Sequence, residues 1–174
     1  MELFISDEAR QNCFPLDSIV PLELELINKL EEDQLDSGRE NYEFKYLSCF
    51  PKWLDEDETH LLDTYFNKTN QDKLNPEMDE QYEKPFIDFF IKQYSEGDLC
   101  VIFSKDDQNF CFRPKVASEL LTYVTSGLRE IQLYSLYDIK RKTYFIFLRD
   151  LTLLVATLKS SSFEIGDCPL HILK

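Results

Sequence analysis

The sequence predicts an α+β fold, in which acidic helices from the N-terminal half pack on a mostly antiparallel sheet from the C-terminal half. The segment Thr143–Leu158 is the richest in β-branched, aromatic and aliphatic residues, and only Arg149 and Asp150 interrupt it. Such a segment has to be covered by the rest of the chain. Charge divides the chain as well: residues 1–98 carry 25 acidic and 9 basic side chains (net −16), whereas residues 99–174 carry 8 and 10 (net +2). The second half is dense in the residue types that strands favour.

These two halves are expected to be layers of one domain. A chain of 174 residues has the usual size of a single domain, and 43% hydrophobic residues are enough for a core. No linker rich in proline, glycine or serine and no internal repeat separates the halves. We therefore expect a single domain over residues 1–174, acidic and mainly helical over 1–98 and sheet-rich over 99–174.

The N-terminal half contains one strand pattern and several helix patterns. Residues 1–20 are ambiguous, and residues 21–35 combine helical apolar spacing with an alternation that also fits a short strand. Tyr42–Leu47 alternates aromatic and charged residues, which indicates a half-buried strand. The acids Asp55–Glu58 precede apolar residues at helical spacing and are typical of a helix N-terminus.

Proline and glycine mark the later helices of this half. Residues 70–75 are expected to form a polar loop, and Asn75 followed by Pro76 is typical of a helix start. Pro85 is expected to break that helix and to start another, which Gly97 ends.

The C-terminal half predicts two hairpins around one helix. Leu99–Ser104 and Asn109–Arg113 form the first hairpin, with Ser104 opposite Asn109, because this register puts the large aromatic residues on one face. A helix is expected between Pro114 and Gly127. Three further elements are expected: a hairpin of Ile131–Tyr137 and Thr143–Arg149 around Lys140–Lys142, a strand over Leu151–Leu158 with a short helix capped by Asp150 as the alternative, and an edge strand near Phe163 and Ile165.

Composition limits the possible partners and the compartment. A net charge of −14 repels nucleic acid and anionic membranes, so the expected partner is a basic protein or none. The five cysteines include no C-x-x-C pair, and the N-terminus lacks a basic region followed by a long apolar run. Residues 151–158 form an uncharged stretch of eight, and a membrane span needs about 20. The expected location is a reducing cytoplasm.

The sequence offers no pattern that is typical of an enzyme. Its two histidines, His60 and His171, lie outside the common nucleophile and zinc motifs, and four glycines leave little room for a phosphate-binding loop. Asp55–Glu58 with His60 could hold a divalent cation, but the glycine and glutamate of an EF-hand loop are missing. We therefore expect no catalytic residue, no metal and no cofactor.

The acidic side chains of the first half are the candidate partner-binding surface. Trp53 is either an exposed anchor of that surface or a core residue. The basic cluster Lys140–Lys142 could contact phosphate, but on a chain of net charge −14 a solvated hairpin tip or a contact for the protein's own acidic half is the favoured interpretation. The predicted partner-binding residues are Trp53, Asp55, Glu56, Asp57, Glu58, Glu77, Asp79, Glu80 and Glu83.

These observations favour a small acidic cytoplasmic protein that inhibits or neutralises a basic macromolecule. Bacterial immunity proteins, which block a toxin such as a nuclease, share this profile, and so do acidic mimics of nucleic acid; the similarity is one of composition alone. Patches of acids beside a sheet rich in apolar residues fit an immunity protein better than a long, regularly charged mimic of nucleic acid. A carboxylate-based or metal-dependent enzyme and an adaptor or structural subunit are the other hypotheses.

Overall fold

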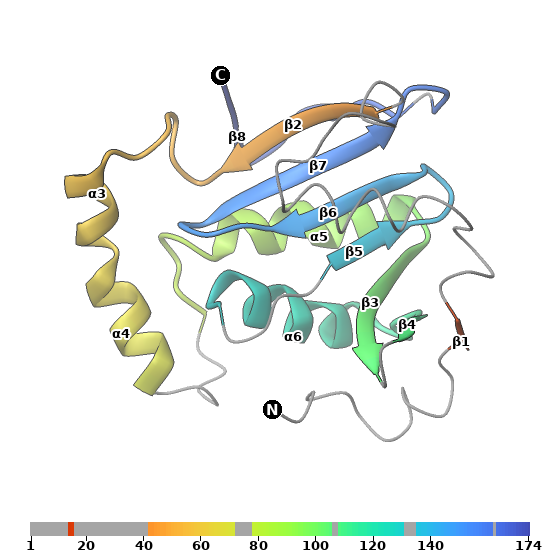
Figure 1. The fold of residues 1–174 in the computed structure, drawn as a ribbon, viewed down its shortest axis with the longest axis horizontal. Helices are drawn as coiled ribbons and strands as arrows, with labels where there is room; N and C mark the ends of the chain where they lie inside the picture. The colour runs from red at the N-terminus through yellow and green to blue at the C-terminus, as the bar shows by residue number, and fades with distance from the viewer. Residues whose placement is uncertain (1–13, 16–41, 72–77, 106–107, 131–134, 162) are drawn as a thin grey trace.

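The fold is an eight-stranded antiparallel sheet with helices on one face (Figure 1). It is taken from a computed structural model that describes residues 14–15, 42–71, 78–105, 108–130, 135–161 and 163–174. The strand order is β1-β4-β3-β5-β6-β7-β2-β8, and every neighbouring pair is antiparallel. The strands are β1 (Phe14–Pro15), β2 (Tyr42–Ser48), β3 (Leu99–Lys105), β4 (Gln108–Phe112), β5 (Ser135–Asp138), β6 (Thr143–Phe147), β7 (Thr152–Leu158) and β8 (His171–Leu173).

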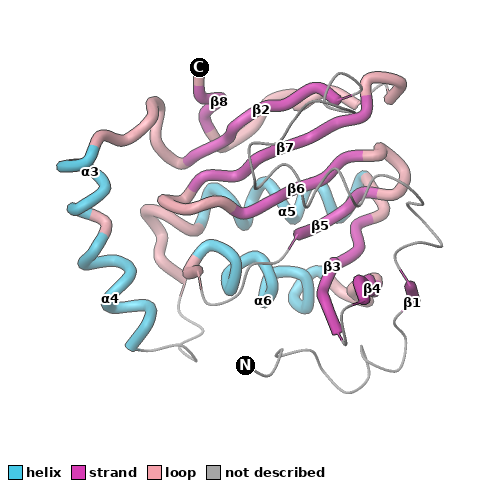
Figure 2. Tube along the Cα trace, in the orientation of Figure 1, coloured by secondary structure: helices cyan, strands magenta, loops and turns pink. Residues whose placement is uncertain are grey.

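The helices fall into two groups with different places in the fold. The helices α5 (Lys84–Glu96) and α6 (Ala117–Leu128) lie side by side on one face of the sheet (Figure 2). The helices α3 (Glu56–Leu61) and α4 (Asp63–Gln71) follow β2 and lie beyond the end of that strand, to one side of the sheet (Figure 1). The predicted α+β class, with helices mostly from the first half and a sheet largely from the second, is confirmed.

An aromatic cluster joins α5 to the middle of the sheet. Phe89 and Phe90 of α5 contact Phe145 of β6, with ring centroids 5.9 and 5.5 Å apart, and Phe90 also lies 5.7 Å from Phe147. These side chains are almost fully buried. Burial of such rings contributes most of the favourable free energy of a core of this kind.

The opposite face of the sheet is also apolar and buried. It carries Tyr42, Tyr137 and Tyr144, whose rings form a row: centroids lie 4.4 Å apart for Tyr137–Tyr144 and 6.3 Å apart for Tyr42–Tyr144. Cys100 and Cys111 belong to the same face and are fully buried. Because apolar residues occupy both faces, β6 and β7 read as continuous hydrophobic runs without alternation.

Several predicted elements are confirmed. The first hairpin has the expected register, with Ser104 opposite Asn109. The second hairpin forms from β5 and β6, and β7 is a strand, so the alternative helix after Asp150 is wrong. Arg149 and Asp150 mark a strand end, because they lie in the turn between β6 and β7.

Other boundaries differ from the predictions. The helix α4 runs to Gln71, so the polar loop predicted at residues 70–75 begins later than expected. The helix predicted to start at Asn75 and to end before Pro85 is wrong for its second part, because residues 79–83 form a turn. The edge strand expected near Phe163 and Ile165 is wrong: these residues have no strand structure and pack on the core, and the edge strand is β8. The predictions for residues 1–13, 16–41, 72–77 and 131–134 lie outside the described residues.

The sheet also takes a strand from the acidic half. Strand β2 pairs with β7 on one side and with β8 on the other, so residues on both sides of the predicted division at residue 98 share one sheet. Tyr42 and Leu47 of β2 are buried on opposite faces. Residues of both halves therefore contribute to one sheet, and the division by charge is not a division of the sheet.

A fully buried ion pair connects α5, α6 and α4. Arg129 donates to Glu83 through Nε to Oε1 (2.6 Å) and through Nη2 to Oε2 (3.0 Å), and Tyr65 Oη donates to Glu83 Oε1 at 2.8 Å. Glu83 has no exposed surface, and Arg129 is only 3% exposed. Burial alone would lower the pKa of Arg129, but the hydrogen bond and the charge of Glu83 outweigh burial and raise it.

Gly97 is required where α5 meets the β5–β6 turn. A Cβ atom at this position would lie 2.0 Å from Asp138 Oδ2. The Asp138 carboxylate cannot give way freely, because its Oδ1 accepts hydrogen bonds from Asp98 N (3.2 Å) and Arg141 N (3.0 Å). The predicted end of the helix at Gly97 is confirmed, and its cause is this close approach, since the backbone of Gly97 is extended.

Candidate partner-binding site

The segment that follows β2 is built around a capping box at the start of α3. Glu58 N donates to Asp55 Oδ1 at 2.8 Å, and Asp55 N donates to Glu58 Oε2 at 3.0 Å. The two side chains therefore satisfy backbone groups that the first helical turn leaves without partners. Two of the predicted partner-binding acids, Asp55 and Glu58, thus have a local structural role.

The other two acids of this run are exposed at the first turn. Glu56 and Asp57 are exposed, and within the described part of the chain neither forms an ion pair. By contrast, Glu58 Oε1 lies 2.7 Å from Lys52 Nζ, and this hydrogen bond lowers the pKa of Glu58. Within the described residues, Glu56 and Asp57 are therefore exposed acids of the first turn without an ion pair.

A second acidic group lies in the turn at residues 79–83. Asp79 Oδ1 accepts hydrogen bonds from Gln81 N (2.9 Å) and Tyr82 N (3.0 Å), and Glu80 is exposed. The Tyr82 ring lies 5.8 Å from Phe50 and 5.1 Å from Tyr65, centroid to centroid. The turn therefore packs between α4 and the residues that lead to Trp53. Glu77 lies outside the described residues.

Glu83 does not belong to the surface, and its assignment to a partner-binding site is wrong. Its carboxylate lies in the interior and is bound by Arg129 and Tyr65. Desolvating a carboxylate is unfavourable unless a cation and hydrogen-bond donors compensate it, and these two residues supply both.

Trp53 is an exposed and well-fixed side chain. It is 48% exposed, its ring makes an edge contact with Tyr46 at 5.1 Å, and its Nε1 donates to Lys174 O at 3.0 Å. Of the two interpretations of Trp53, the core residue is wrong and the exposed position is correct. The contacts hold the indole in place while half of its surface stays open to solvent.

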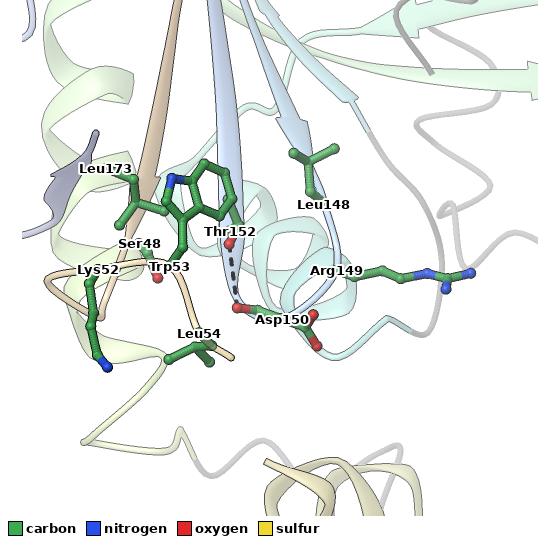
Figure 3. A pocket seen from close by; sticks show the side chains of 9 residues that line it. All are labelled: Ser48, Lys52, Trp53, Leu54, Leu148, Arg149, Asp150, Thr152 and Leu173. Atoms are coloured by element: carbon green, nitrogen blue, oxygen red, sulfur yellow. Dashed lines mark hydrogen bonds between the residues drawn. The ribbon is translucent and has the colours of Figure 1, made fainter. Parts of the chain in front are cut away.

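A pocket of about 210 Å³ lies beside Trp53 (Figure 3). It forms where β2 ends, where β6 turns into β7 and where β8 meets β2. Asp150 and Leu151 have φ angles of 60° and 56°, so the β6–β7 turn uses left-handed backbone at two successive residues. The pocket is lined by Ser48, Lys52, Trp53, Leu54, Leu148, Arg149, Asp150, Thr152 and Leu173. We call this set the Trp53 pocket.

Sequence reasoning did not find the Trp53 pocket. Its residues come from three segments, 48–54, 148–152 and 173, which only the pairing of β2 with β7 and β8 brings together. One signal was present: the polar pair Arg149-Asp150 interrupts the most apolar run in the chain. From the sequence alone, that pair predicts only the end of a strand.

The basic cluster at the β5–β6 turn contacts the protein's own acidic half. Arg141 Nη2 donates to Glu96 Oε2 at 3.1 Å, Arg141 Nη1 donates to Gln93 Oε1, and Lys140 Nζ donates to Glu96 O at 3.2 Å. Arg141 is mostly buried by these contacts and by the ring of Phe163, 4.8 Å away. Of the two interpretations of this cluster, the contact with the acidic half is the one that describes Arg141.

The other ionisable groups do not assemble into a second site within the described ranges. No group of three His, Cys, Asp or Glu side chains there could hold a metal ion. His60 and His171 are exposed on different elements, and His60 Nδ1 contacts Asp63 Oδ2 at 2.9 Å. Burial raises the pKa of the Cys49 thiol to about 11 and also raises that of Cys168.

Comparisons with known proteins add no family to this picture. No protein-family description, no curated protein and no solved structure matches the chain. None of the described helices combines the length and the apolar composition that a membrane span requires.

Proposed function

We propose that this protein is a small acidic binding protein that inhibits or neutralises a basic macromolecular partner, in the manner of an immunity protein that blocks a toxin. One observation carries the proposal: an exposed, fixed tryptophan lies directly before a helix start whose acids Glu56 and Asp57 are exposed. Exposed aromatic anchors dominate the binding energy of many protein interfaces. Glu56 and Asp57 lie close to Trp53 in the chain, and their negative charge favours a partner whose contacting surface is basic.

The distribution of charge supports a protein partner over other classes. The chain carries a net charge of −14, which repels nucleic acid and anionic lipid. The described acids of the candidate site lie at a helix start and in one turn, and they do not form long regular rows. Such patches suit a folded basic surface, and complementary charge increases the rate of association.

The first experiment is capture of a basic partner from the source organism at low salt, followed by binding kinetics with the purified partner. Charge reversal should be confined to Glu56→Lys and Asp57→Lys, because Asp55 and Glu58 form the capping box and their loss would also weaken α3. The double variant should associate with the partner about tenfold more slowly at low salt, and the difference should shrink as salt rises.

A matched control is available in the C-terminal tail. Glu164 and Asp167 are exposed and lie outside the candidate site, so Glu164→Lys with Asp167→Lys changes the net charge by the same amount. Equal slowing by both double variants would show that only total charge matters. Retention of no basic partner at low salt would contradict the proposed function itself.

A further inference from the structure

The helices α3 and α4, which we call the arm, differ from α5 in how much of their surface is buried. The arm follows β2 and lies beyond the end of that strand, to one side of the sheet (Figure 1). Among the described side chains at residues 56–67, only Leu62 and Tyr65 are buried, and Leu61 is 76% exposed. By contrast, α5 buries four side chains: Phe86, Phe89, Phe90 and Gln93. Because burial of apolar surface is what holds a helix to a sheet, the arm is held less strongly than α5.

The Tyr65 hydroxyl attaches the arm to the sheet with α5 and α6, which we call the body. Tyr65 Oη donates to Glu83 Oε1 at 2.8 Å, and the Tyr65 ring lies 5.1 Å from the ring of Tyr82. Glu83 is also bound by Arg129, which donates to both of its carboxylate oxygens. When Tyr65 leaves, the carboxylate therefore keeps its cation. Separation of the arm from the body leaves no buried charge without a partner, which is the most costly consequence of breaking a buried polar network.

The chain between Trp53 and Asp55 is suited to be the hinge of the arm. Trp53 is fixed to the body by the hydrogen bond and the ring contact described above. Asp55 belongs to the arm, because the capping box with Glu58 joins it to the first turn of α3. Leu54 is the single residue between these two attachments. The ion pair of Lys52 with Glu58, 2.7 Å long, crosses this point, but an ion pair on the surface contributes little to stability.

We propose that the arm opens as one unit about Leu54 while the body stays folded. The capping box lies within the arm and the buried ion pair lies within the body, so both persist in the open state. Opening breaks the hydrogen bond of Tyr65 and exposes its ring to water. It costs less free energy than global unfolding, because the core between α5, α6 and the sheet is kept. Glu56 and Asp57 move with the arm, so the candidate partner-binding acids change their position relative to Trp53.

Hydrogen–deuterium exchange of the whole chain, followed by mass spectrometry of its peptides, tests the opening. The free protein is used, so a failure of this test is distinct from a failure of the proposed function. Under conditions in which exchange reports the opening equilibrium, amides of residues 58–67 should be protected at least about 100-fold less than those of residues 89–93 in α5. Tyr65→Phe should accelerate exchange in the arm about 10- to 150-fold, because it removes a hydrogen bond to a charged group.

Variants in the body separate opening of the arm from global unfolding. Gly97→Ala brings a methyl group against Asp138, and this contact is the same whether the arm is closed or open. It should therefore accelerate exchange in α5 about fivefold or more and leave exchange in the arm unchanged. Tyr94→Phe is the matched control for Tyr65→Phe, because it removes a tyrosine hydroxyl that donates to Pro114 O at 3.1 Å outside the arm. Exchange in the arm should again stay the same.

Two sets of results would overturn the proposal. The arm is not a separate unit if its amides are as well protected as those of α5, or if Gly97→Ala accelerates both by the same factor. Tyr65 does not hold the arm if Tyr65→Phe leaves exchange there unchanged, or if Tyr94→Phe accelerates it equally. Circular dichroism of each variant checks that the comparison is made between folded proteins.

Discussion

The buried pair Glu83–Arg129 allows a quantitative test of what holds the helices together. In Arg129→Met the carboxylate of Glu83 would stay buried but lose its cation and two hydrogen bonds of 2.6 and 3.0 Å. Removing one partner of a buried ion pair costs about 3–5 kcal/mol, a large part of the roughly 5–15 kcal/mol that stabilises a typical domain. For a chain of this length that loss corresponds to a fall in Tm of roughly 6–20 °C.

Two companion variants separate the charge from the packing. Tyr65→Phe removes one hydrogen bond to the same carboxylate and leaves the cation, so it should cost less, about 1.5–3 kcal/mol. Adding Glu83→Gln to Arg129→Met removes the isolated charge and should restore about 1–3 kcal/mol. Urea denaturation followed by circular dichroism measures all four proteins. A loss below about 1 kcal/mol for Arg129→Met, or no recovery in the double variant, would refute this reasoning.

Two further predictions concern single residues. Gly97→Ala should destabilise the protein by about 1–3 kcal/mol, because the new methyl group meets Asp138, whereas Gly166→Ala, with no atom within 4 Å of the added Cβ, should stay within about 0.5 kcal/mol; urea denaturation measures both, and equal effects would contradict the close approach. The pKa of Cys49 is about 11 in the folded protein and 9.0 for an ordinary thiol, so the unfolded chain loses this proton first and stability falls as pH rises from 9 to 11. The same fall should be smaller in Cys49→Ser, which paired denaturation curves at pH 8 and 10.5 measure; identical falls would show that Cys49 does not contribute.

The predictable part of the fold consists of elements whose partners are close in sequence. The hairpin of β3 and β4 follows from alternation and a short connection, which together fix Ser104 opposite Asn109. Local signals also place the start of α3 at Asp55 and the end of α5 at Gly97. In these cases the residues that determine the structure lie within about one turn or one hairpin of each other.

The unpredicted part depends on residues that are distant in sequence. Glu83 has the pattern of a surface acid, and only Arg129, 46 positions further on, makes its burial possible. The Trp53 pocket requires the pairing of Ser48 with Thr152 and His171, which no local pattern specifies. The sequence predicts an edge strand near Phe163 and Ile165, but both side chains pack against the core and β8 forms the edge.

The position of β2 also has a consequence for how the chain reaches its fold. Strand β2 is synthesised early, but β7 begins only at Thr152, so the alternating segment Tyr42–Ser48 has to wait for most of the chain to be made. Unpaired strands with aromatic side chains tend to pair with other copies of the same chain. The net charge of −16 over residues 1–98 makes newly made chains repel one another during this interval. The acidity of the first half thus opposes association between nascent chains until β7 and β8, the partners of β2, have been synthesised.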